Sequence, residues 1–373
     1  MDLKTSLNNG TRIRRTLLAA SVAALSLTGQ LRAQTDQKLQ QIAAFPDHQV
    51  TGITVAGDGR IFLCFPYWSD PHTISVARLD ANSTLTPYPD ENWNQEGGAP
   101  ADHFICVQSV VADDQNNLWV LDPASIKMQK VTPNGAKLVK IDLSRNAVVD
   151  KIVFPESVVP SKSYLNDVRF DTQNGYAFIT DSGIGGLVVV DLRNKQARRV
   201  LADNPSTKAE ASVLLKIEGI PLINEKTGKP FQANSDGIEI DKANGYLYYQ
   251  ALVGRTLYRI KLADLENAKL SDAELGRGGE TVATVPASDG LALRNNFIYF
   301  TAIEQDAIDR LDLDSRDLSV VVKDARLKWP DTLSFGPDGT LYVTNSQIHL
   351  TPRFNHGLNK VKEPFGVYKI ENP

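Results

Sequence analysis

The chain has 373 residues, of which 42% are hydrophobic and 23% are charged, and its formal net charge is −4. This composition allows a large buried core, and the length would correspond to two or three ordinary domains unless the chain is built from repeats. The slight acidic excess argues against partners such as nucleic acid or an anionic membrane surface.

The first 33 residues have the layout of a secretory signal peptide. Arg12, Arg14 and Arg15 precede an uncharged run over residues 16–31, and the segment ends on a small residue, Ala33. The run is short and contains Ser, Thr and Gly, so a cleaved leader is favoured over a membrane anchor. Because Arg14-Arg15 also resembles a twin-arginine signal, we expect a secreted or periplasmic protein exported by either route, with no membrane span after cleavage.

From residue 51 onward, one hairpin pattern recurs six times. An alternating apolar strand, a polar turn and a second strand rich in aromatic and β-branched residues make up each copy. The turns carry Gly, Asn and Asp, which tolerate the positive φ of tight hairpins. The copies are TGITVAGDGRIFLCF from Thr51, QSVVADDQNNLWVLD from Gln108, NDVRFDTQNGYAFITD from Asn166, DGIEIDKANGYLYYQA from Asp236, DGLALRNNFIYFTA from Asp289 and DTLSFGPDGTLYVTN from Asp331.

Several copies continue into a third strand, as at residues 187–192, 256–262 and 365–370. A short helix is expected at residues 264–274, and no sustained helical periodicity competes with the strands. The copies therefore predict an all-β six-bladed propeller over residues 34–373, in which radial stacking protects the sheet edges. Residues 39–45 form a spare strand that would close the ring in the last blade. Six regular copies argue against the alternative of two packed β-sandwiches.

Cys64 and Cys106 lie far outside any zinc or redox spacing. After export they would either form a disulfide or remain as two buried free thiols.

The residues that open the first strands predict a ring of oxygens around the channel. In a propeller these positions are equivalent, and three consecutive blades offer carboxylates there. The ring comprises Thr51, Gln108, Asn166, Asp236, Asp289 and Asp331. The second strands return to the same face, where Glu304 and His349 follow them; the residues at their ends are Phe65, Asp122, Asp181, Ala251, Ala302 and Asn345.

Carboxylates crowded at one mouth must take up protons or share a cation. Hard oxygen ligands suit Ca²⁺ or Mg²⁺, so we predict one divalent cation and no organic cofactor. The predicted metal ligands are Asn166, Asp236, Asp289 and Asp331, and the predicted ligand-binding residues are Gln108, Asp122, Asp181, Glu304, Asn345 and His349. The alternative is that Asp and Asn at strand starts bind the backbone of their own turns.

With the copies aligned, the chain resembles the yellow and major royal jelly protein family in its bacterial branch. The stretches that carry the resemblance are GRIFLCFPYW, LTPYPDENWN, VQSVVADDQNNLWVLD, YLNDVRFDTQNGYAFITDSGIGGLVVVDL, SDGIEIDKANGYLYYQAL and WPDTLSFGPDGTLYVTNSQIH. The resemblance implies a six-bladed propeller with a small-molecule site. Family members include proteins that bind biogenic amines and others implicated in dopachrome conversion.

Bacterial members are similar to gluconolactonase and regucalcin-like propellers, which hold a divalent cation with a Glu, an Asn and an Asp. Asn166 and either Asp236 or Asp289 match the last two ligands, but Thr51 stands where those enzymes have the Glu. The resemblance therefore implies that Asp331 or Asp181 would supply the missing ligand.

Three functions follow for an exported, monomeric protein with a small-molecule partner. The first is a lactonase-like hydrolase in which a cation polarises the carbonyl and Asp236 or Asp289 activates water as the catalytic base. The second is a binding protein for a small aromatic or amine ligand. The third is a tautomerase of the dopachrome type, which needs an acid–base pair.

Overall fold

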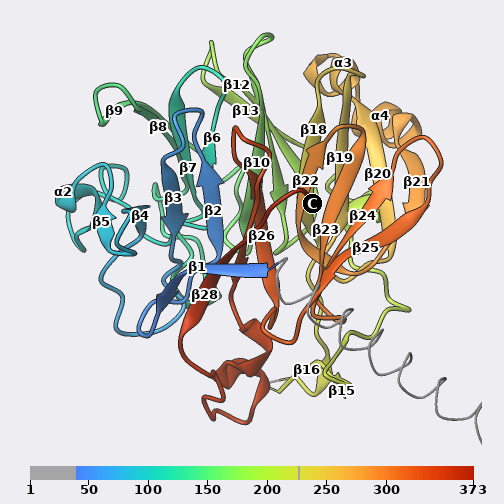
Figure 1. The fold of residues 1–373 in the computed structure, drawn as a ribbon. Coiled ribbons are helices and arrows are strands. Elements are labelled where there is room, and N and C mark those ends of the chain that lie inside the picture. Colours follow the sequence, from blue (N-terminus) through green and yellow to red (C-terminus); the bar gives the residue numbers. More distant parts are fainter. Residues whose placement is uncertain (1–38, 226) are drawn as a thin grey trace, which may run out of the picture.

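The computed structural model describes residues 39–225 and 227–373. Within these residues, six four-stranded antiparallel sheets surround a common axis as the blades of a propeller, which confirms the predicted fold (Figure 1). The first strands of neighbouring blades contact one another around the whole ring. The predicted signal peptide, residues 1–33, lies outside the described residues.

The blades follow the chain in order, each running from its inner to its outer strand. Blade 1 contains β2 (Gly52–Val55), β3 (Ile61–Cys64), β4 (Val76–Leu79) and β5 (Leu85–Pro87). Blade 2 contains β6 (Ser109–Ala112), β7 (Asn117–Asp122), β8 (Lys137–Asp142) and β9 (Ala147–Val153). Blades 3 and 4 contain β10 (Leu165–Asp171), β11 (Tyr176–Asp181), β12 (Leu187–Asp191), β13 (Gln196–Val200) and β18 (Ser235–Asp241), β19 (Tyr246–Ala251), β20 (Thr256–Lys261), β21 (Glu280–Thr284). Blade 5 contains β22 (Ser288–Arg294), β23 (Phe297–Ala302), β24 (Ala307–Asp312) and β25 (Leu318–Lys323).

Blade 6 is built from both ends of the described chain. Its strand order is β26 (Pro330–Phe335), β27 (Leu341–Asn345), β28 (Phe365–Ile370) and β1 (Leu39–Phe45). β1 pairs antiparallel with β28 from Leu39 opposite Ile370 to Phe45 opposite Phe365. The N-terminal strand thus closes the ring as predicted, and the last blade gains an outer strand that the C-terminal segment does not supply.

Aromatic and aliphatic side chains between adjacent blades form the core. Trp119 of blade 2 stacks on Phe170 of blade 3 with ring centroids 4.8 Å apart, and Tyr299 of blade 5 meets Phe335 of blade 6 edge-on at 5.1 Å. Because each blade is apolar on both faces, burial requires a neighbour on either side, and a closed ring provides it.

Two long connections reach the same end of the propeller. Residues 201–234 join blades 3 and 4 and contain η2 (Pro205–Thr207) and the short strands β14 (Lys216–Ile217), β15 (Ile220–Pro221), β16 (Ile223–Asn224) and β17 (Lys229–Pro230). Residues 346–364 join β27 to β28 and contain η3 (Ile348–Leu350) and η4 (Pro352–Phe354). The connections touch each other between β16 and η4, below the ring in the view of Figure 1.

The remaining helices are short. α2 (Glu91–Asn94) follows blade 1, η1 (Ile126–Met128) lies in blade 2, and α3 (Leu262–Glu266) and α4 (Asp272–Gly278) precede β21. The helix expected at residues 264–274 is therefore two helices, because Ser271 caps α4 through a capping box with Glu274 and starts a new helix there. None of the helices in the described part of the chain is long and apolar enough to cross a membrane.

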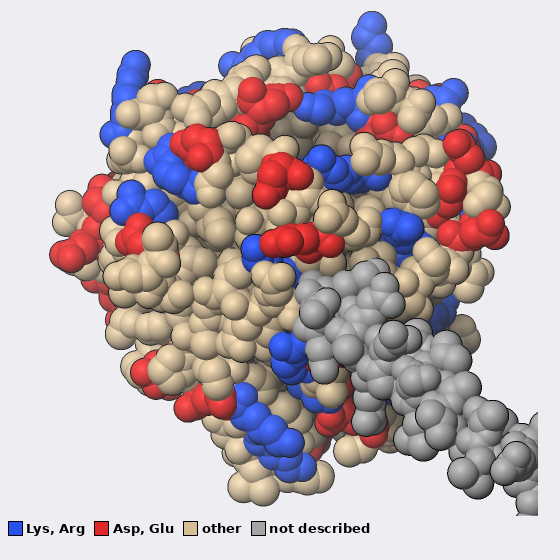
Figure 2. All heavy atoms as spheres, viewed as in Figure 1, with Lys and Arg blue, Asp and Glu red and all other residues tan. Residues whose placement is uncertain are grey.

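Cys64 and Cys106 are both buried and unpaired, which matches the free-thiol alternative. Figure 2 shows lysine and arginine side chains interspersed with aspartate and glutamate over the face it presents.

Candidate functional site

A β-bulge opens the first strand of each of blades 3 to 6. In each of these bulges, three residues of the first strand lie opposite two residues of the second strand. The predicted oxygen-bearing residues lie inside the bulges: Asn166, Asp236, Asp289 and Asp331. A bulge leaves residues unpaired in the ladder and redirects their side chains, so these positions can face the channel mouth.

Close approach of the inner strands explains the Asp-Gly pairs at two of these bulges. A Cβ added at Gly290 would lie 2.3 Å from the backbone oxygen of Asp331, and one at Gly237 would lie 3.0 Å from that of Asp289. Any larger residue would push neighbouring first strands apart.

Threonines on the second strands hold the bulges in place. The hydroxyl of Thr301 accepts hydrogen bonds from the backbone N–H groups of Asp289 (3.1 Å) and Gly290 (2.9 Å). Thr344 accepts one from Thr332 at 3.0 Å in the same way. In blades 5 and 6 these N–H groups of the bulge are therefore satisfied without using the carboxyls of Asp289 and Asp331, which remain available to the mouth.

Three aspartates form what we call the carboxyl cluster: Asp236, Asp289 and Asp331, whose exposed fractions are 2%, 7% and 3%. The carboxyl groups of Asp236 and Asp289 are within hydrogen-bonding reach of each other. Asn166 Nδ2 donates to Asp236 Oδ2 at 2.7 Å, and the indole Nε1 of Trp329 donates to Asp289 Oδ2 at 2.6 Å. The structure thus brings together all four predicted metal ligands at the start of the first strands.

Burial and mutual repulsion set the ionisation of the cluster. Burial, followed by the charge of Asp289, raises the pKa of Asp236 and of Asp331 well above the ordinary range. Burial also raises the pKa of Asp289, to about 6, although hydrogen bonds from Trp329 and Asp236 oppose the rise. Asp236 and Asp331 therefore keep their protons to a higher pH than an ordinary carboxyl, and Asp289 loses its proton above about pH 6.

Several oxygens at the mouth are buried without a donor. Among the described residues, Asp236 Oδ1, Asp331 Oδ2 and Asn345 Oδ1 have no hydrogen-bond partner. Buried acceptors of this kind call for a proton, a water or an ion. Nowhere in residues 39–225 and 227–373 are three His, Cys, Asp or Glu side chains arranged to hold a metal ion, so a cation here would combine at most two carboxylates with neutral oxygens such as that of Asn166.

Trp329 and His349 cover the cluster. Trp329 is fully buried with φ of +58°, a left-handed conformation that a bulky residue adopts only when its surroundings hold it there. His349 stacks on its indole, with ring centroids 6.0 Å apart at 13°. Burial lowers the pKa of His349 to about 4, so the ring is neutral, and neither ring nitrogen has a hydrogen-bond partner among the described residues.

Gln108 lies at the mouth in a chain of polar contacts. Its Oε1 accepts from the hydroxyl of Tyr164 at 2.8 Å, and that hydroxyl accepts from Trp68 Nε1 at 2.6 Å. Thr51, the first-blade member of the predicted ring, is buried with its hydroxyl 3.9 Å from Cys64 Sγ.

Asp122 and Asp181 have structural contacts. Both oxygens of Asp122 are used: they accept from Lys137 Nζ at 2.7 Å and from the backbone of Ile105 at 2.8 Å, Cys106 at 3.0 Å and Ala124 at 2.8 Å. Asp181 accepts from Arg199 at 2.5 Å, from the hydroxyl of Ser163 and from three backbone N–H groups, those of Tyr164, Gly183 and Ile184. The oxygens of Asp122 and Asp181 already accept hydrogen bonds, as the alternative of structural, backbone-binding aspartates predicts. Of the candidate carboxylates, Asp331 therefore joins Asp236 and Asp289 in the cluster.

Glu304 lies apart from the cluster. It pairs with Arg255 and accepts from the backbone N–H of Lys216 at 2.8 Å, which ties the connection 201–234 to blade 5.

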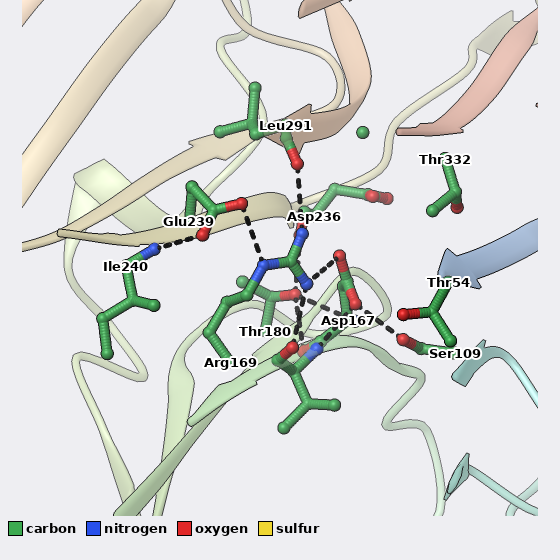
Figure 3. A network of polar contacts seen from close by, with 12 residues as sticks. Thr54, Ser109, Asp167, Arg169, Thr180, Asp236, Glu239, Ile240, Leu291 and Thr332 are labelled. Atoms are coloured by element: carbon green, nitrogen blue, oxygen red, sulfur yellow. Dashed lines mark hydrogen bonds and ion pairs between the residues drawn. The ribbon is translucent and has the colours of Figure 1, made fainter. Parts of the chain in front are cut away.

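An arginine network separates the cluster from the rest of the channel. Arg169 donates to Asp167 (2.8 Å), Glu239 (3.1 Å) and the backbone oxygen of Leu291 (3.1 Å), as Figure 3 shows with Asp236 beside it. A cavity of about 300 Å³ extends on the far side of Arg169 toward Asp114 and Lys242. Arg169 was not predicted as a residue of the site, although the alternation of polar residues along the inner strand from Asn166 was an available signal for it.

Fold and site together define a six-bladed propeller whose channel mouth holds buried acidic and amide oxygens. The chain belongs to the major royal jelly protein family, whose sequence profile matches residues 105–370. The predicted family is thereby confirmed.

Solved structures share the fold at low identity. The chain is similar to a calcium-binding protein, regucalcin, from Agrobacterium tumefaciens, with a TM-score of 0.54 and 13% identity over 89% of this chain and 92% of that one. It is also similar to virginiamycin B lyase from Staphylococcus aureus, with a TM-score of 0.50 and 13% identity over 89% and 99% of the two chains. At such identities the likeness concerns the propeller alone.

Proposed function

We propose that this protein is a lactonase-like hydrolase that acts on small cyclic esters at the carboxyl cluster with the help of one divalent cation. The observation that carries the proposal is the set of buried oxygens without donors at the start of the first strands. The calcium-binding activity named for the regucalcin of similar fold agrees with a hard cation at this end of the channel.

Asn166, Asp236 and Asp289 would hold the cation, and Asp331 would balance its charge from the next blade. When bound, the cation would polarise the ester carbonyl as a Lewis acid. The residues fit such an ion because all offer oxygen, and Asp236 Oδ1 is buried without a hydrogen-bond partner. Protons compete with the ion for these carboxyls, so affinity should rise with pH.

Asp289 is the residue we assign as general base. Its carboxyl lies in the cluster beside Asp236 and, when ionised, can accept a proton from water. Trp329 fixes its orientation through the indole N–H, and Asn166 fixes that of Asp236. The aromatic residues over the cluster restrict the entry of bulk water, which strengthens these polar interactions.

A second candidate function is binding without turnover of a small aromatic or amine ligand. The aromatic side chains at the mouth favour it, since Trp68, Phe231, Trp329 and Phe354 belong to one apolar cluster beside the carboxyls. Such walls bind planar ligands, and an acidic group beneath them favours a cation.

Metal analysis combined with a lactone panel tests the proposal. The purified protein is analysed for bound elements and then melted with Ca²⁺, Mg²⁺, Mn²⁺ or Zn²⁺ at pH 6 and pH 8. We expect stabilisation by a hard cation, larger at pH 8, and metal-dependent lactone hydrolysis that is lost in Asp236→Asn and retained in the exposed control Asp203→Asn. Absence of cation-induced stabilisation would rule out the hydrolase, and saturable binding of an amine without product would establish the second candidate.

A further inference from the structure

The guanidinium of Arg353 lies on the aromatic rings of Phe231 and Phe354 at the channel mouth. It lies in η4 of the connection 346–364, with its central carbon 5.3 Å from the ring centre of Phe231 and 5.4 Å from that of Phe354. The two rings meet edge to face at 5.2 Å and 87°. Its NH1 group reaches Met128 Sδ from blade 2, so the side chain bridges three separate segments.

No carboxylate neutralises this cation within residues 39–225 and 227–373. Other arginines at the same end of the propeller do have acidic partners, Arg199 with Asp181 and Arg255 with Glu304. The Arg353 side chain is exposed at the edge of the aromatic cluster. An arginine stays protonated in proteins, so its guanidinium on the two rings retains unused donors.

The position of Arg353 connects it to the carboxyl cluster. Phe231 and Phe354 share one apolar cluster with Trp68 and Trp329, and Trp329 donates directly to Asp289. A ligand that enters between these aromatic residues would therefore meet the guanidinium at one end and the carboxyls at the other.

We infer that the ligand of this site carries a carboxylate, which the planar donor fork of Arg353 binds while the rest of the molecule reaches the carboxyl cluster. A guanidinium can donate two parallel hydrogen bonds to the two oxygens of a carboxylate. The single thioether sulfur of Met128 cannot accept such a pair. This inference rests on the proposed small-molecule site and narrows its substrates to lactones with a free carboxylate. It also disfavours amines as ligands, because Arg353 would repel them.

Three matched probes test the inference by isothermal titration calorimetry: 3-phenylpropionate, its primary amide and phenethylamine. They share the aromatic ring and differ in the charge of the terminal group. The proteins are the full chain, Arg353→Gln, Arg353→Lys and Arg277→Gln, the last replacing an exposed arginine of α4. We expect the parent chain and Arg277→Gln to bind the carboxylate most tightly, and Arg353→Gln to lose that preference by roughly 10- to 100-fold.

The ratio of carboxylate to amide affinity is the deciding quantity, because general damage to the mouth would weaken both probes together. We expect Arg353→Lys to recover part of the ratio. An unchanged ratio in Arg353→Gln, tighter binding of phenethylamine, or no binding of any probe would overturn the inference. If the inference fails but the protein hydrolyses neutral lactones in a metal-dependent way, the hydrolase proposal stands. If Arg353→Gln loses carboxylate binding but the parent chain hydrolyses no lactone, the inference about Arg353 stands and the hydrolase proposal fails.

Discussion

Replacement of Asp289 by Asn should stabilise the protein and abolish its activity. Asp289 has a pKa of about 6, so it is ionised near neutral pH, and it is buried beside Asp236 and Asp331. Asn keeps an oxygen that can accept the hydrogen bond of Trp329 and carries no charge. The substitution therefore removes a desolvated charge and leaves the packing almost unchanged.

The size of the effect follows from the proton equilibrium. Asp289 holds its proton up to about pH 6 in the folded protein but loses it near its ordinary value of 3.8 in the unfolded chain. Between these values the folded state binds more protons, so the free energy of unfolding falls as the pH rises. The difference corresponds to about 3 kcal/mol above pH 6, and Asp289→Asn should recover it at pH 7 and gain little at pH 4.

Urea denaturation followed by tryptophan fluorescence, in EDTA and between pH 4 and pH 8, measures this difference. Asp203→Asn is the control, because Asp203 is exposed and outside the cluster. Added Ca²⁺ should stabilise the parent chain at pH 8 and not the variant, since the cation would compensate the charge. Equal stability of the two proteins at pH 7 would refute the assignment of a buried, ionised Asp289.

Three further changes test other parts of the structure. Lys137→Met leaves a buried carboxylate without its cation and should lower the free energy of unfolding by about 3–5 kcal/mol in urea denaturation; an unchanged midpoint would contradict a buried ion pair. Gly290→Ala should lower the melting temperature and ligand affinity because its Cβ meets backbone, whereas Gly57→Ala, with nothing within 4 Å, should change neither. Cys64 and Cys106 should react with a thiol reagent only after denaturation; labelling of the native protein would show that they are exposed.

Much of the fold could be predicted from local signals. The alternation of apolar residues and the Gly and Asn turns repeat in every blade, and the spare strand at residues 39–45 has one free edge to join. The helix predicted at residues 264–274 is instead two helices, because Ser271 starts a new helix through a local capping box with Glu274. The number of blades is thus predicted by the periodicity, whereas the β-bulges in blades 3 to 6 are not.

The position of the site could be predicted from the sequence, but the residues that belong to it could be predicted only in part. Equivalence of the strand starts places Asn166, Asp236, Asp289 and Asp331 at one mouth. The same reasoning included Asp122 and Asp181, whose roles depend on distant donors, Lys137 and Arg199, that no spacing along the chain reveals.

The sequence by itself determined the six blades, the closure of the ring and the end of the channel where polar oxygens gather, because each follows from a repeated local pattern. The tertiary structure decided which carboxyls accept hydrogen bonds from backbone N–H groups and cationic side chains. It also decided which carboxyls are buried together in the cluster. The same contacts place Trp329 over the cluster and Arg353 on the rings of Phe231 and Phe354. These properties depend on burial and on contacts between segments far apart in the chain, and the free energy of a buried charge is fixed by those surroundings.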